Sequence, residues 1–167
     1  RARVPDSMMH FVAGLNRGAH AAARRIRSSH ILPEYDFDNM VSVSRLSADV
    51  AVLVLQRPIS IEDVRPVNIS AVGAERGPLS LVSYSHGRPH APSIETGAEV
   101  IGRRGDVMLM DLAVTFGASG SPILVGNGAE KQLFGIVSAS SSSNGRRIAL
   151  TIPVEQAVHR LMRHISP

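Results

Sequence analysis

Short runs of β-branched and apolar residues, separated by turn signals, make up most of this sequence. Runs such as "DVAVLVL", "VMLMDLAV" and "RIALTI" have the residue types and lengths that favour strands. Asn-Gly pairs begin at Asn127 and Asn144, and such pairs favour tight hairpins because both residues tolerate positive φ. Many short strands at this spacing predict an all-β fold built as a barrel or a sandwich.

The last segment of the chain has a different periodicity. After Pro153, which suits the start of a helix, apolar residues recur at helical spacing. These residues are Ala157, Val158, Leu161, Met162 and Ile165. The pattern predicts one C-terminal helix over residues 153–167.

A proline-rich stretch divides the strand-forming parts of the chain. Residues 57–78, "RPISIEDVRPVNISAVGAERGP", hold three prolines and no strong strand pattern. We therefore expect one strand-rich unit over residues 1–60, a linker over 61–76, and a second strand-rich unit over 77–152.

Composition excludes several classes of site. The chain has no cysteine, which excludes disulfides, thiolate zinc sites and a cysteine nucleophile. The net charge of +4 comes from arginines scattered along the chain, and aromatic residues make up only 4%, so nucleic-acid binding is not expected. No apolar run is long enough to span a bilayer. His86 and His90 lie in a Gly- and Pro-containing loop that does not favour a metal site, and no metal or cofactor is expected.

The segment "TFGASGSPILV" places Ser119 among small residues, just before an apolar run. A nucleophilic serine needs a base to take its proton and donors that hold the oxyanion formed on the attacked carbonyl. Small residues allow a tight turn to present backbone N–H groups, here those of Gly117 and Ser119. The same pattern also fits a flexible bend, so partners elsewhere in the chain must decide.

Asp49 begins a run, "DVAVLVL", that is otherwise apolar. Aspartate is a poor strand former, and its charge is costly to bury without donors. Asp49 is therefore either a turn residue ahead of a buried strand or a carboxylate directed at an imidazole.

Taken in order, "ADVAVLVL", "GASGSP" and "FGIVSAS" resemble segments of the trypsin-like (chymotrypsin-fold) serine peptidases, especially their compact bacterial members. The resemblance implies two antiparallel β-barrels packed side by side, the first one incomplete here, followed by the C-terminal α-helix. It also implies that Asp49 is the triad aspartate, that Ser119 is the nucleophile, and that the amides of Gly117 and Ser119 form the oxyanion hole.

Further roles follow from the same resemblance. Ser138 would support Asp49, and Ser138, Ala139 and Ser140 would align an extended peptide or protein substrate. Ala113 matches the base of the specificity pocket, which implies a preference for small or medium apolar side chains. The family also implies a serine endopeptidase that needs no cofactor and is secreted or periplasmic.

Two features depart from the family pattern. Ala118 stands where zymogen-type members have an aspartate that pairs with a newly cut amino terminus, so any control of activity here must work differently. The family also needs a histidine before the aspartate, within an Ala-Ala-His segment, and this sequence has none. His10 lies in a segment that matches the strand after the histidine's loop, His20 lies in an Ala/Arg stretch, and His30 matches a non-catalytic position.

Two explanations of the missing histidine remain open. The chain is a fragment whose catalytic histidine lies upstream, which the start at Arg1 without a methionine favours, and the fragment itself is then nearly inactive. Alternatively, the chain is a non-catalytic, protease-like module that binds peptides.

Overall fold

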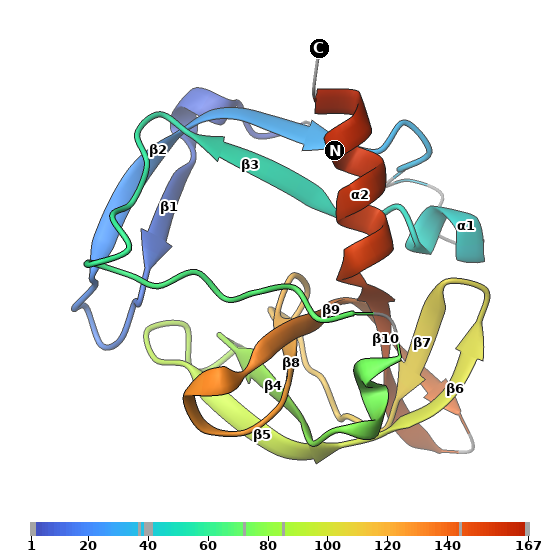
Figure 1. Ribbon diagram of the computed structural model, residues 1–167. Coiled ribbons are helices and arrows are strands. Elements are labelled where there is room, and N and C mark those ends of the chain that lie inside the picture. Colours follow the sequence, from blue (N-terminus) through green and yellow to red (C-terminus); the bar gives the residue numbers. More distant parts are fainter. Residues whose placement is uncertain are drawn as a thin grey trace.

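The computed structural model contains two antiparallel β-sheets and a C-terminal helix, which confirms the predicted all-β class (Figure 1). It describes residues 3–36, 38, 42–71, 73–84, 86–143 and 145–165. Short helices lie outside the strands: η1 (Asp6–Met8), α1 (Val43–Leu46), η3 (Ala74–Arg76) and η4 (Gly128–Glu130).

The first sheet has three strands in the order β1 (His10–Ala13), β2 (Ala22–Ile31) and β3 (Ala51–Leu55). Both pairs of neighbours are antiparallel. The turn between β1 and β2 uses Arg17 and Gly18 at positive φ, closed by a bridge between Asn16 and Ala19. Helix α1 comes between β2 and β3, and Asp49 lies just before β3.

The second sheet has seven strands and curls into a half-barrel, in the lower part of Figure 1. Its order is β5-β4-β8-β9-β10-β7-β6, and every pair of neighbours is antiparallel. The strands are β4 (Leu79–Ser83), β5 (Ser93–Ala98), β6 (Val100–Arg104), β7 (Val107–Met110), β8 (Pro122–Val125), β9 (Gln132–Ser143) and β10 (Arg146–Pro153). The sheet encloses an apolar core that includes Met108, Met110, Ile123 and Val137.

The sequence predicts tight hairpins at the two Asn-Gly pairs of the second sheet. Asn127 lies in the connection between β8 and β9, where η4 takes the place of a tight two-residue hairpin. Strands β9 and β10 pair up to Ser143 and Arg146, which flank the second Asn-Gly pair. Asn144 itself lies outside the described residues, as does the end of the predicted helix at residues 166–167.

Helix α2 (Val154–Ile165) joins the two sheets. Ala157 and Leu161 on its apolar face are buried with Leu32 and Val50 of the first-sheet region and with Ile152 of β10. Figure 1 shows the helix rising from the end of β10 alongside the first sheet. We call these five residues the joint cluster; their packing holds the segment of Asp49 beside the second sheet.

Between the two sheets, the described residues 56–71 and 73–78 contain no strand. It docks on the second sheet through Ser70, whose N–H donates to the Leu133 carbonyl, and through Asn68, whose carbonyl accepts from the Leu133 N–H. The division of the chain into units at residues 61–76 stays a prediction.

Candidate active site

The loop that carries Ser119 runs between β7 and β8, and its small residues are needed for its shape. The N–H of Ala118 donates to the Thr115 carbonyl at 3.1 Å, and the N–H of Gly120 donates to the Val137 carbonyl of β9 at 2.7 Å. Gly117 and Gly120 have φ values of 91° and 81°, in the left-handed region that favours glycine. Ala118 is buried, which leaves no room for a larger side chain without rearrangement.

Two backbone amides of this loop remain unused. Ala118, Gly120 and Ser121 all donate their N–H groups within the protein. The N–H groups of Gly117 and Ser119 have no acceptor in the part of the chain that the structure describes. These are the two amides that the sequence predicts for an oxyanion hole, whose donors must be free to bind a ligand oxygen.

Asp49 is held at a turn between two buried residues. Its N–H donates to the Leu46 carbonyl at 3.1 Å as α1 ends, and its neighbours Ala48 and Val50 are both buried. The main chain therefore leaves the Asp49 side chain, which is partly buried, at the start of β3 and beside the second sheet. Asp49 is therefore a turn residue, and this position is compatible with a carboxylate directed at an imidazole.

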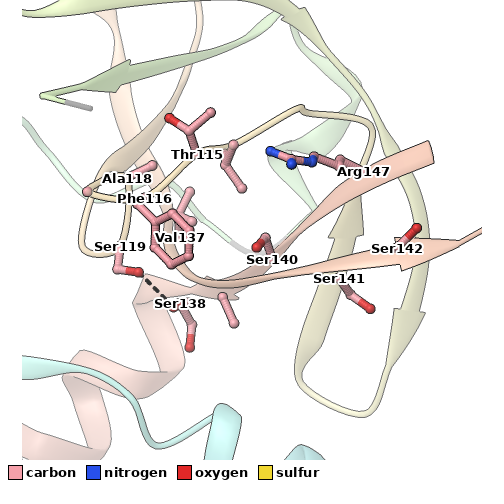
Figure 2. Close-up of a pocket in the computed structure, with 13 residues that line it drawn as sticks. Thr115, Phe116, Ala118, Ser119, Val137, Ser138, Ser140, Ser141, Ser142 and Arg147 are labelled. Carbon is pink, nitrogen blue, oxygen red and sulfur yellow. Dashed lines mark hydrogen bonds between the residues drawn. The ribbon is translucent and has the colours of Figure 1, made fainter. Parts of the chain in front are cut away.

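Ser138 on β9 connects Asp49 to Ser119. Its Oγ donates to Oδ2 of Asp49 at 2.6 Å, and its carbonyl accepts from Oγ of Ser119 at 3.2 Å, the bond drawn in Figure 2. Ser138 is itself only 8% exposed. A single residue of the second sheet thus brings together the two side chains that the sequence singles out, although one comes from the β7–β8 loop and the other from the turn before β3.

Tyr35, which no sequence motif singles out, also faces Asp49. Burial, the negative charge of Asp49 and a hydrogen bond to Asp49 together raise the pKa of the Tyr35 phenol above its usual value. Tyr35 lies in the segment "HILPEYDFD", whose only hint is a pair of aromatic residues among acidic ones. Asp49 is therefore flanked by two hydroxyl groups.

No described histidine hydrogen-bonds to Ser119 or to Asp49. His10 and His20 are exposed, and Nε2 of His30 lies 2.9 Å from Oγ of Ser28. His86 comes near the loop only through its backbone N–H, which donates to the Phe116 carbonyl. Among the described residues, the hydrogen-bond partners of the Ser119 and Asp49 side chains therefore do not include a histidine base.

A cavity of about 560 Å³ adjoins Ser119 (Figure 2). Its walls are residues 114–119 of the loop, residues 137–142 of β9 and Arg147 of β10. The predicted substrate-aligning residues Ser138, Ala139 and Ser140 are thus part of its wall. Ala113 is exposed and is not among the lining residues. No sequence motif singles out Arg147, and strand alternation alone does not tell whether its side chain faces this cavity.

The described ranges hold no group of three or more His, Cys, Asp or Glu residues able to bind a metal ion. None of their helices combines the length and the apolar character needed to cross a membrane.

Comparisons with known proteins identify the fold. No family model matches the sequence, and no curated protein does. The structure is similar to the protease Anisep from Arthrobacter nicotinovorans, with a TM-score of 0.67 and 14% identity over 91% of this chain and 73% of that one. It is also similar to the thermostable serine protease AL20 from an extremophilic microorganism, with a TM-score of 0.66 and 14% identity over 94% of this chain and 74% of that one. The chain therefore has the chymotrypsin fold of the trypsin-like serine proteases.

Proposed function

We propose that this chain contributes the nucleophile and the aspartate of a serine endopeptidase. The observation that carries the proposal is the hydrogen-bonded series from Ser119 through Ser138 to Asp49 across the two sheets. The two free amides of the serine loop and the adjoining cavity support it. A peptide or protein is the substrate, and no cofactor takes part.

The proposed reaction proceeds in two stages. Oγ of Ser119 attacks the scissile carbonyl while a histidine takes the serine proton, and the N–H groups of Gly117 and Ser119 hold the oxyanion. Collapse of this intermediate transfers the proton to the leaving amine and leaves an acyl-serine, which water hydrolyses by the reverse sequence of proton transfers. Asp49 orients the imidazole and stabilises its charged form.

The proposal assigns the base to a histidine upstream of Arg1. The reason is the match between the segment around His10 and the strand that follows the histidine's loop in the family. In the structure this segment is β1, paired with β2 in the first sheet. The chain without that histidine is expected to be nearly inactive, since removing the base of a triad costs about 10⁶ in turnover.

Substrate alignment is proposed for residues 138–140 of β9. Their partner on one side is β10, where Ala139 pairs with Leu150 and Ser140 with Ala149. On the other side β8 pairs with β9 only as far as Ile136. An extended peptide that adds to this open edge gains main-chain hydrogen bonds next to Ser119.

A second candidate function is peptide binding without hydrolysis. It uses the same open edge and the same cavity, and it requires no base. The observation that favours it is that no described histidine hydrogen-bonds to Ser119 or Asp49.

A fluorophosphonate probe separates the two candidates, because only an activated serine reacts with it. The test compares the full parent protein with its Ser119→Ala variant. We expect labelling at Ser119 in the parent protein and none in the variant, together with hydrolysis of a peptide mixture. Binding of peptides by a parent protein that the probe does not label would establish the binding module instead.

The proposal extends to location. Compact bacterial peptidases of this family act outside the cytoplasm, so we propose that the parent protein is secreted or periplasmic. Cell fractionation of the source organism checks this, and a strictly cytoplasmic protein would contradict it.

A further inference from the structure

Arg147 projects a positive charge into the cavity beside Ser119. It lies on β10 directly opposite Ser142 of β9, and Ala149 lies opposite Ser140. Directly paired residues of an antiparallel ladder share a face, so Arg147, Ser142 and Ser140 lie on one side of the sheet. Figure 2 shows the Arg147 side chain extending across the cavity toward the segment that carries Thr115.

Within the described part of the chain, the guanidinium of Arg147 has no counter-charge. It makes no hydrogen bond or ion pair with any residue that the structure describes. Its neighbour Arg146, in contrast, pairs with Asp111 at 2.8 Å. A free guanidinium presents a planar set of N–H donors that matches the two oxygens of a carboxylate.

The rest of the cavity wall is suited to the same kind of ligand. Its described lining residues include no aspartate or glutamate, whereas the hydroxyls of Thr115, Ser140 and Ser142 belong to lining residues. Hydroxyl groups donate to carboxylate oxygens that the guanidinium leaves free. The net charge of +4 on the whole chain also favours the approach of acidic peptides.

We propose that this cavity binds an acidic side chain, glutamate or aspartate, of the residue whose carbonyl Ser119 attacks. The inference rests on the proposed function for the identity of the attacked residue, but binding of the acidic side chain does not itself require hydrolysis. An apolar side chain, as expected from Ala113, would fill the cavity without pairing with Arg147 or the serine hydroxyls. Sites with polar groups discriminate strongly against ligands that leave those groups unpaired.

The test measures binding of acetylated, amidated tetrapeptides that differ only in the last residue: Glu, Asp, Gln, Leu or Lys. Isothermal titration calorimetry on the parent protein with Ser119→Ala prevents turnover during the measurement. We expect the Glu peptide to bind about 10- to 100-fold more tightly than its neutral isostere Gln, the range for a hydrogen-bonded charge. The preference should weaken as salt is raised.

Variants assign the preference to one side chain. Arg147→Gln should remove the difference between the Glu and Gln peptides, and Arg147→Lys should retain part of it because the charge remains. Arg25→Gln is the matched control, since Arg25 is exposed on β2 and the net charge changes equally. The Glu and Gln comparison on the Ser119→Ala protein needs no Arg147 variant, so misfolding of an Arg147 variant does not leave the inference undecided.

The inference fails if the Glu and Gln peptides bind equally, if the Leu peptide binds most tightly, or if none binds. Its failure is separable from that of the proposed function. Tight, Arg147-dependent binding of the Glu peptide without fluorophosphonate labelling would support the inference and contradict the proposed hydrolase function. Labelling at Ser119 with fastest cleavage after leucine would support the proposed hydrolase function and contradict the preference for an acidic side chain.

Discussion

The loop that carries Ser119 is held by its own sheet, whereas Asp49 lies at the start of a sheet that depends on contacts outside itself. Gly120 and Ser121 of the serine loop exchange backbone hydrogen bonds with Val137 of β9, above a closed apolar core. The first sheet has only three strands and leaves Phe11 and Leu53 more than 40% exposed.

This difference shows which half of the candidate site is preformed. The serine, both free amides and the cavity come from the second sheet and its loops. The first-sheet region contributes Asp49 and Tyr35, which reach the site through the joint cluster and through Ser138. Changes at the joint should therefore affect the aspartate side more than the serine side.

The largest effect is expected from Leu161→Ala in α2. Leu161 is fully buried in the joint cluster, and truncating such a leucine costs about 2–5 kcal/mol of unfolding free energy. Urea denaturation measures the loss, and hydrogen exchange should show increased opening in β3 before β8. Met162→Ala, at an exposed position of the same helix, is the control with little effect. Equal opening of β3 and β8 would contradict the expectation that changes at the joint affect the aspartate side more than the serine side.

A smaller loss is expected from Gly135→Ala inside the second sheet. A Cβ at Gly135 would come within 2.6 Å of the Thr151 Cγ2 methyl and 3.1 Å of the Ile152 carbonyl, and such overpacking costs about 1–3 kcal/mol. Gly102→Ala meets nothing within 4 Å and should be nearly neutral. Thr151→Ser removes the clashing methyl, so the double variant should recover part of the loss in thermal unfolding. No recovery would point to the carbonyl contact instead.

Ser138→Ala tests the connection between the two halves. It removes the hydrogen bond from Ser138 Oγ to Asp49 Oδ2 and should cost about 1–2 kcal/mol, because the acceptor is a partly buried carboxylate. Ser140→Ala, at an exposed position of the same strand, should change stability little. If the two variants unfold at the same denaturant concentration, Ser138 does not join the sheets energetically.

The smallest effect concerns the titration of Tyr35. Its pKa is raised first by burial and then by the charge and hydrogen bond of Asp49, so Asp49→Asn should move that pKa back toward the usual value. In the unaltered protein, the raised pKa means that the folded state favours the neutral phenol of Tyr35. This contribution to stability is complete below the ordinary tyrosine pKa and is lost as pH rises through the raised one.

Ultraviolet difference titration of tyrosinate measures this pKa, with Tyr35→Phe to assign the signal against Tyr84. Asp36→Asn serves as the control, because Asp36 is not among the causes of the Tyr35 shift. An unchanged Tyr35 titration in Asp49→Asn would show that burial alone sets the pKa.

Local sequence determined the parts of this protein that neighbouring residues decide. Alternating and apolar runs define the strands, the apolar period defines α2, and glycines around Ser119 permit the positive φ values of its loop. The family motifs also led to the correct fold, because each motif stays within one strand or one turn.

Only the tertiary structure decided which distant residues meet. Tyr35 and Asp49 belong to different segments, and their approach depends on the packing of the first-sheet region against α2. Arg147 reaches the serine cavity, and Ala113 does not, because of the register between β9 and β10 and the path of the loop after β7. Side-chain meetings of this kind depend on strand register and sheet curvature, which arise from contacts between remote parts of the chain and leave no signal in the residues near either partner.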